Sequence, residues 1–379
     1  MEKDSKYVPF HVSKEQMLVD KLEASVKQLP EFCGPFFKEL SRFENKATST
    51  LLAYSNDLRI FFIWAKEYLP EYYDTELRDL PVDLLGKLKV SDIKSYMLDY
   101  VPCYSSTVKV SETSDGEEIF KEFKRSNSKT TAARKLSTLK KFYHFYNNLS
   151  SDEKYHIDND PVSSIKQSKD IKQEIKYLND KDTCAVFSCI ESGDGLAGKS
   201  KKWNEKTRLR DKAIIALFLG TGIRVSELAG INIQDIDFDN NSIQVFRKEH
   251  RNDTVYMSDE VSSALLSYIN DSRVQIFKPD KENENALFLS FKHNRMSISA
   301  IERCVKKYTQ IATGENGYSC HKLRDTFGTR IYAETGGNAK KVQTAMNHKS
   351  ASTSLDYYVA AIEGKEKEDT FKKTHIEGL

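Results

Sequence analysis

The apolar run Ala213–Leu219 (AIIALFL) is followed, after Gly220, by TGIRVSEL, residues 221–228. Such a run fills the middle of a buried helix, and the chain then places an arginine, Arg224, where that helix should turn a corner. A fixed positive charge beside a hydrophobic segment is costly unless an anion is paired with it. Glu227, three residues further on, is one available partner. The sequence therefore predicts a packed helical core with a charged site at its edge.

The chain of 379 residues is long enough for two domains. Residues 158–180 are polar, contain Pro161 and carry almost no apolar pattern, which indicates a linker. We expect a helical domain over 1–165, a linker over 166–178 and a second domain over 179–379.

Helical spacing of apolar residues in 45–69, 90–101 and 128–149 predicts an all-α first domain. Ser91 is the expected N-cap of the second of these helices. The segment 104–127 is polar and rich in Ser, Glu and Lys, so we expect a loop or a mobile insertion there.

The two long helices of this domain begin with hydroxyl and cationic side chains, which suit contact with phosphate. The candidates for DNA contact are Lys46, Thr48 and Ser49 at the start of one helix and Lys129, Thr130 and Arg134 at the start of the other. Ordinary N-capping explains the hydroxyls equally well.

In the second domain, Ile243–Phe246 and Thr254–Met257 alternate apolar and polar residues around the loop KEHRND, as in a β-hairpin. The remaining patterns are helical, and the last expected helix covers about 352–364. The predicted fold class is mainly α, with an all-α first domain and an α+β second domain that holds a small antiparallel three-stranded sheet.

Composition excludes several classes of protein. The net charge of +2 gives no basic tail, so any surface for nucleic acid must be local. The six cysteines form no CxxC pair, so neither a disulfide framework nor a zinc site is expected. No apolar run is long enough to span a membrane. We expect a soluble cytoplasmic protein without a membrane segment, metal or cofactor.

Four segments of the second domain carry charged or nucleophilic groups: TGIRVSEL, the hairpin tip at Lys248, HKLRDTF (321–327) and NHKSASTSLDYY (347–358). Each has a simpler explanation when taken alone. Lys248 can be a solvated loop lysine, and His321 can cap the helix that follows it. Hairpin alignment also leaves Arg247 and Arg251 as competitors of Lys248.

Helical phase separates the two adjacent tyrosines of the last segment. Leu355, Tyr358, Val359 and Ile362 share one face, so Tyr358 belongs to the packing stripe. Tyr357 lies roughly 200° away from Leu355, at roughly 100° per residue, and can present its hydroxyl to a substrate. By the same reasoning His321 and Arg324, three residues apart, project together from one helix edge.

Together these groups suit one reaction class, the cleavage of a phosphodiester. Arginine forks bind phosphate and stabilise the charge of its transition state. A tyrosine hydroxyl can attack phosphorus, a lysine can protonate the departing alkoxide, and a histidine can accept a proton or bond the phosphate. No metal is needed, because the cations supply the electrostatic stabilisation.

The order and context of the four segments resemble the tyrosine recombinase (phage integrase) family, particularly the Xer-type single-protein recombinases of Gram-positive bacteria. The motifs cover about 180–365, and the helical layout of the first domain resembles the core-binding domain. The resemblance implies the catalytic set Arg224, Lys248, His321, Arg324, His348 and Tyr357, with Glu227 supporting Arg224 and Arg247 contacting DNA. Asp325 stands where the family commonly has histidine, and Met346-Asn347-His348 replaces Leu-Gly-His.

The resemblance further implies a site-specific recombinase that forms a 3′-phosphotyrosine and exchanges strands through a Holliday junction. Its partners would be double-stranded DNA with an inverted-repeat site and a homotetramer on two sites, with one dimer per site. Residues 363–379 would form an arm that docks on a neighbouring subunit, unless they are simply disordered. The alternatives are an integrase or transposase of a mobile element, a type IB topoisomerase, and a non-catalytic DNA-binding protein.

Overall fold

The computed structural model describes residues 10–112, 118–150, 153–166, 176–247 and 251–347 of the chain. The chain divides into two compact units, Met1–Ile171 and Lys172–Leu379. We call these the first unit and the second unit.

The helices of the first unit form around long apolar stripes. They are α1 (Phe10–Val26), α2 (Cys33–Arg42), α3 (Thr48–Tyr68), α4 (Asp83–Lys87), α5 (Val90–Ser95) and α6 (Lys129–Asn147), with the short helical turns η1 (Pro70–Tyr72), η2 (Leu77–Asp79) and η3 (Tyr96–Tyr100). Phe61, Phe62 and Phe142 are fully buried where α3 meets α6, and their rings pack edge to face. This aromatic core fixes how the two predicted DNA-contacting helices sit against each other.

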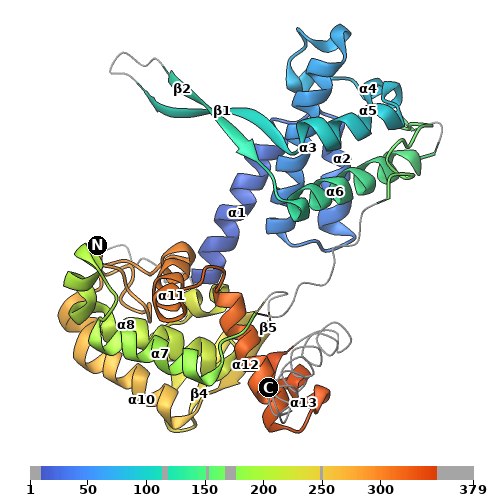
Figure 1. Cartoon of the computed structure of the whole chain (residues 1–379). Helices are drawn as coiled ribbons and strands as arrows, with labels where there is room; N and C mark the ends of the chain where they lie inside the picture. The colour runs from blue at the N-terminus through green and yellow to red at the C-terminus, as the bar shows by residue number, and fades with distance from the viewer. Residues whose placement is uncertain (1–9, 113–117, 151–152, 167–175, 248–250, 348–379) are drawn as a thin grey trace, which may run out of the picture. The chain divides into compact units, whose positions relative to one another are not determined.

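Two details of the first unit differ from expectation. Helix α5 begins at Val90, and the Asp92 carboxylate accepts the Lys89 N–H at 2.8 Å, so Ser91 lies inside the helix and is not its N-cap. The expected loop at 104–127 is instead an antiparallel ribbon of β1 (Cys103–Glu112) and β2 (Glu118–Ser126). The first unit is therefore not entirely helical. Figure 1 shows this ribbon extending away from the helices of its own unit.

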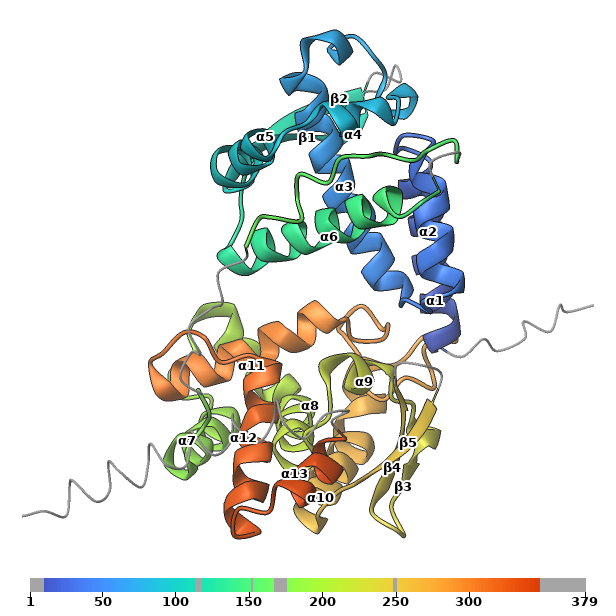
Figure 2. The same ribbon diagram turned by 90° about the vertical axis from the view of Figure 1, so that its right-hand side faces the viewer.

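The second unit is built around α8 (Gly198–Thr221), whose residues Ala213–Leu219 are buried as predicted. It packs against α7 (Asp180–Ser192), α10 (Asp259–Tyr268), α11 (Ile298–Thr313) and α12 (Cys320–Glu334). The unit also contains α9 (Val225–Gly230), η4 (Ile233–Asp235), η5 (Ile269–Phe277) and α13 (Ala339–Met346). Figure 2 shows α13 beside α12, in agreement with the contacts between them.

A three-stranded antiparallel sheet completes the second unit in the order β3 (Ile236–Asp237), β4 (Ser242–Arg247) and β5 (Arg251–Tyr256). Ile243 pairs with Val255 and Val245 with Asp253. The mainly helical fold with one small three-stranded sheet is thus confirmed.

A buried ionic cluster joins α8 to α11. Asp211 is fully buried and accepts hydrogen bonds from Arg210 at 2.8 Å, Lys307 at 3.1 Å and the Tyr308 hydroxyl at 2.9 Å. Burial by itself would raise the pKa of Asp211, but the two cations outweigh burial and lower it below the ordinary value. The cluster fixes the position of α11 on the central helix.

Candidate active site

Arg224 lies in the short connection between α8 and α9, directly before the first residue of α9. Helix α8 ends at Thr221, and Gly222 reverses the chain with a φ of 60°. A Cβ at Gly222 would lie 2.4 Å from Cδ1 of Phe327 and 3.1 Å from Sδ of Met346. A glycine is required there both by its backbone conformation and by the close packing around it.

Glu227 orients Arg224 through two hydrogen bonds. Its Oε1 accepts from the guanidinium Nη1 at 2.8 Å, and its Oε2 accepts from the Arg224 backbone N–H at 3.0 Å. The Glu227 side chain is 4% exposed and that of Arg224 is 41% exposed. The carboxylate is therefore buried behind a guanidinium that reaches the surface, which leaves the cation accessible to an anion.

Arg324, on α12, connects the Arg224 turn to the end of α13. Its side chain is buried, with 3% of the residue exposed, and it donates hydrogen bonds to the carbonyl oxygens of Gly222 and Met346. Because these carbonyls belong to different elements, one guanidinium fixes the spacing between the first motif and the last. The predicted arginines, 100 residues apart in sequence, are thus brought into one region of the second unit.

His321 is in the first turn of α12, and its side chain is 75% exposed. It does not cap this helix, because the N-cap is Ser319, whose hydroxyl accepts from the Lys322 N–H. Its Nε2 lies 3.7 Å from Oδ1 of Asp325, and Lys322 Nζ lies 3.2 Å from Oδ2. Asp325, the departure from the family pattern, is thus a buried carboxylate that faces His321.

Arg247, the last residue of β4, is placed mostly in the interior of the unit. Its side chain is 12% exposed, and its Nε lies 2.8 Å from Oδ2 of Asp253 on β5. Lys248 follows directly but, with 249 and 250, is outside the described residues. The predicted DNA contact of Arg247 and the predicted role of Lys248 remain predictions.

The end of α13 shows how this chain replaces the family's glycine before the second histidine. Asn347 adopts the left-handed conformation with a φ of 46°, which asparagine tolerates better than most residues. Its side-chain amide donates to Oδ2 of Asp253. His348, Tyr357, the expected helix at 352–364 and the arm at 363–379 lie outside the described residues.

The predicted DNA contacts of the first unit are at the starts of α3 and α6. Ser49, Lys129 and Thr130 are exposed. Lys46 Nζ lies 3.5 Å from Glu44, and the Thr48 hydroxyl donates to Glu15 at 2.5 Å. These six residues, Arg134 included, remain candidates.

Asp57, which was not predicted from the sequence as a functional residue, anchors Arg134. It is 2% exposed on α3 and forms ion pairs with Arg134 and with Lys135, the latter at 3.1 Å. Burial lowers the pKa of Lys135, while Asp57 opposes that shift. An acidic residue inside the aromatic stripe of 45–69 was the available signal, because a buried carboxylate requires a cationic partner.

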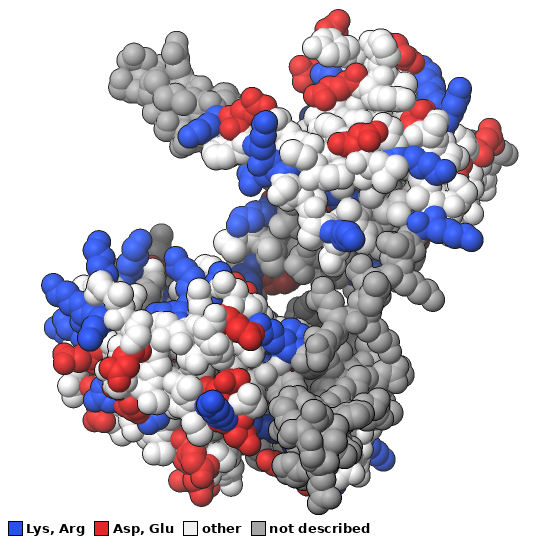
Figure 3. Space-filling view, viewed as in Figure 1, with Lys and Arg blue, Asp and Glu red and all other residues white. Residues whose placement is uncertain are grey.

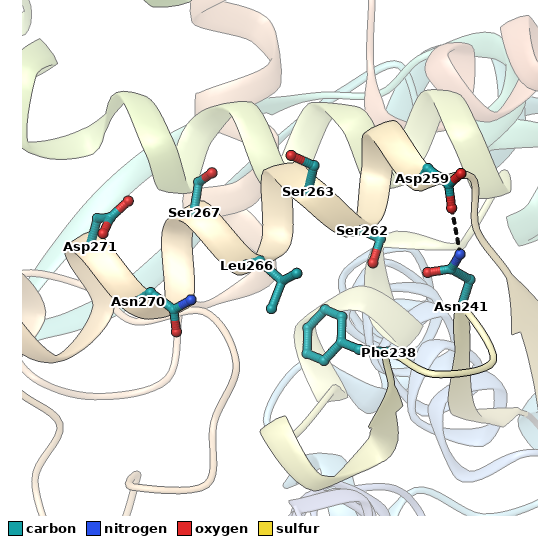
Figure 4. A pocket seen from close by; sticks show the side chains of 9 residues that line it. All are labelled: Phe238, Asn241, Asp259, Ser262, Ser263, Leu266, Ser267, Asn270 and Asp271. Carbon is teal, nitrogen blue, oxygen red and sulfur yellow. Dashed lines mark hydrogen bonds between the residues drawn. The ribbon is translucent and has the colours of Figure 1, made fainter.

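A groove of about 450 Å³ on the second unit is not lined by Arg224, His321 or Arg324. Figure 4 shows it along one face of α10, where serines and acidic or amide side chains lie beside Leu266 and Phe238. The described residues that line it include no lysine or arginine, so it does not suit a phosphate. Within the described ranges there is also no group of three His, Cys, Asp or Glu residues arranged to hold a metal ion.

Lysine and arginine side chains gather on the second unit where α8 begins (Figure 3). Lys199, Lys201, Lys202 and Lys206 are exposed there, and Lys206 lies 5.0 Å from the ring centre of Trp203. Because the whole chain has a net charge of only +2, any surface for nucleic acid must be a local group of basic residues such as this one. No helix in the described part of the chain has the length and apolarity needed to cross a membrane.

Comparison with known proteins gives the family. A model of the phage integrase family matches residues 196–363. The tyrosine recombinase XerC of Natranaerobius thermophilus is 30% identical, over 60% of this chain and 71% of that relative. The tyrosine recombinase XerS of Streptococcus mutans is 27% identical, over 93% of this chain and 98% of that relative. The fold is similar to the crystal structure of a XerH site-specific recombinase bound to a palindromic difH substrate, with a TM-score of 0.60, 16% identity and 95% of each chain covered.

The chain therefore belongs to the phage integrase family of tyrosine recombinases, as its four motifs indicated. Its activity is that of an enzyme of site-specific recombination, which cleaves and rejoins DNA.

Proposed function

We propose that this recombinase cleaves DNA through a covalent 3′-phosphotyrosine on Tyr357. The Tyr357 oxygen attacks the scissile phosphorus while the bond from phosphorus to the 5′ oxygen breaks. Lys248 gives its proton to the departing 5′ oxygen, and one of the two histidines accepts the tyrosine proton. Attack by a 5′-hydroxyl of the partner strand reverses the reaction, so the bond energy is conserved in the tyrosine linkage.

The observation that supports this proposal most is the bridge made by Arg324. Its hydrogen bonds to Gly222 and Met346 bring Arg224 within reach of the segment that leads to His348. Two guanidinium groups in one region suit the two non-bridging oxygens of a phosphate, whose charge increases in the transition state.

Tyr357→Phe tests the proposal. We expect the variant to bind its DNA site normally and to form no covalent adduct on a nicked suicide substrate, because it lacks the attacking oxygen. Tyr358→Phe is the matched control and should still form the adduct, since Tyr358 is assigned to packing. An adduct formed by Tyr357→Phe would contradict the assignment.

The substrate is double-stranded DNA, on which we propose that two dimers assemble as a tetramer and exchange strands through a Holliday junction. The XerH structure to which the fold is similar is bound to a palindromic site, and a palindrome suits a two-fold dimer. The C-terminal arm at 363–379 would join neighbouring subunits. We place this reaction in the cytoplasm.

Chromosome partition at cell division is the biological role to test first. The match to XerS extends over nearly the full length of both chains, which supports an Xer-type role. Integration or excision of a mobile element uses the same chemistry. Resolution by this protein of a chromosomal inverted-repeat site placed twice on one plasmid would support the partition role.

A further inference from the structure

Asp253, on β5, lies where the hairpin meets the end of α13. Its Oδ2 is 2.8 Å from Nε of Arg247 and accepts a hydrogen bond from the side-chain amide of Asn347. Its Oδ1 accepts the Thr254 backbone N–H at 3.0 Å, which fixes the rotamer of the carboxylate. One carboxylate thus joins two strands of the hairpin to a helix 94 residues further along the chain.

Strand register explains why Asp253 and Arg247 meet. Asp253 pairs with Val245, and side chains alternate along a strand, so Val245, Arg247 and Asp253 share one face. Val245 is 2% exposed, so this is the inward face of the hairpin. Nε and Nη1 of Arg247 are buried and form no hydrogen bond with a described residue, although Nε lies in ion-pair contact with Asp253. The Asp253 carboxylate is therefore the charge that compensates this buried guanidinium.

These contacts complete a chain through the predicted catalytic region. Arg324 holds the carbonyls of Gly222 and Met346, and Asn347, the next residue, holds Asp253, which in turn pairs with Arg247. Arg247 immediately precedes Lys248 in the sequence. Arg247, which flanks the predicted general acid, is thereby linked through Asp253 and Asn347 to Arg324, one of the two arginines predicted to bind phosphate.

We propose that Asp253 is a positioning residue, which fastens the hairpin that carries Lys248 to the end of α13 and so places the general acid at the leaving oxygen. The inference rests on the proposed function. It assigns to Asn347 two tasks in place of the family's glycine: the left-handed turn and the anchor for Asp253. A glycine at 347 would perform only the first.

The test compares two leaving groups. Asp253→Ala should lower single-turnover cleavage of an ordinary suicide substrate about 100-fold, because a misplaced catalytic group costs on the order of that factor. On a substrate with sulfur in place of the scissile 5′ oxygen, the thiolate departs without a proton donor. There the loss should shrink to below about 10-fold, as it should for Lys248→Ala. Affinity for the uncleaved site should match wild type.

Asn347→Gly separates the anchor from the turn. It should show a loss no larger than that of Asp253→Ala and the same rescue by sulfur. The double variant should be no slower than Asp253→Ala alone, because that substitution already removes the contact between Asp253 and Asn347. Asp239→Ala, at an exposed position in the β3–β4 turn, is the matched control and should cleave normally.

Equal losses by Asp253→Ala on both substrates would overturn the inference, because they would indicate general damage to the site. Normal cleavage by Asp253→Ala of the ordinary substrate would also overturn it. In either case an adduct with wild-type protein would leave the proposed function intact. Absence of a wild-type adduct on both substrates would overturn the proposed function and the inference together.

Discussion

At the scale of single residues, the buried carboxylate of Glu227 holds the guanidinium of Arg224 in a position that is accessible to an anion. The backbone of Arg224 and its guanidinium are both bound to the same carboxylate. This double attachment restricts the rotamers of a long side chain, so less conformational entropy is lost when an anion binds. The pair explains how a charge can be placed beside the core.

Replacing the two residues should separate the direct role from the supporting one. We expect Arg224→Ala to lower the cleavage rate by a factor of roughly 10²–10³, because it removes about 3–4 kcal/mol of stabilisation of the transition-state charge. Glu227→Gln should lower it by less, since the guanidinium remains but is held by fewer hydrogen bonds. Single-turnover cleavage of a suicide substrate measures both.

The exposed Ser226 lies on the same short helix, so Ser226→Ala is the control and should cleave at the wild-type rate. Cleavage by Arg224→Ala at a near-normal rate would contradict the assignment of this arginine to the phosphate.

Local spacing predicted the contact of Arg224 with Glu227, because residues three apart on a helix meet. It placed His321 and Arg324 on one flank but missed their difference in burial, 75% exposed for the histidine side chain and 3% for the arginine. It also missed the contact of Asp253 with Asn347. That contact depends on how the hairpin packs against α13, and no local pattern encodes such packing.

At the scale of elements, the cluster of Arg210, Asp211, Lys307 and Tyr308 is what fastens α11 to α8. Removing one member of a buried ionic group is far more costly than removing a surface pair, because the remaining charges lose their compensation. The pKa of Asp211 lies below its ordinary value, so the cluster is stabilised by ionisation of this carboxylate.

Asp211→Asn should therefore lower the free energy of unfolding at neutral pH by about 3–5 kcal/mol, measured by urea denaturation. In the wild type this contribution is complete above the unfolded-state pKa of an aspartate, and it is lost as pH falls through the lower folded-state pKa. The variant should lack that part of the acid dependence.

Asp271→Asn, at an exposed position in η5, should leave both the stability and its acid dependence unchanged. A loss of less than about 1 kcal/mol for Asp211→Asn would show that the cluster is not a major source of stability, since exposed pairs contribute about that much.

The ribbon of β1 and β2 shows why the sequence predicted a loop in this segment. Strands are recognised by alternating apolar residues that face a core. The described side chains at 121–126 are all exposed, so this part of the ribbon has no apolar face to leave such a pattern. Its backbone pairing satisfies the hydrogen bonds of the strands even so. The helices α3 and α6, by contrast, bury continuous apolar stripes, and the predicted ranges 45–69 and 128–149 match them to within three residues at either end.

At the scale of the whole molecule, binding to DNA has to come from local charge, because the sum over the chain is only +2. The candidates for DNA contact at the start of α6 belong to the first unit, and the lysines at the start of α8 belong to the second. They are therefore two separate basic surfaces. Contacts with phosphate should position the protein without carrying sequence information.

Lys129→Ala should weaken binding to specific and non-specific DNA by a similar factor. It should also reduce the slope of log affinity against log salt concentration by about 1, because one phosphate contact releases one counterion. Fluorescence anisotropy at several salt concentrations measures both quantities. Lys281→Ala, at an exposed loop position before α11, should leave the slope unchanged. An unchanged slope for Lys129→Ala would remove this residue from the interface.

The crowding around Gly222 restricts how this protein can evolve. A larger residue there meets Phe327 and Met346, and the left-handed backbone opposes any side chain even if those neighbours become smaller. Two independent barriers therefore protect one position, because replacing this glycine requires both smaller neighbours and a changed backbone, which no single substitution supplies. Phe327 and Met346 are constrained together with Gly222. A smaller residue at either position alone would leave a gap in the packing and would not allow a side chain at 222, because the left-handed backbone still opposes one. We therefore expect this corner of the enzyme to tolerate few substitutions.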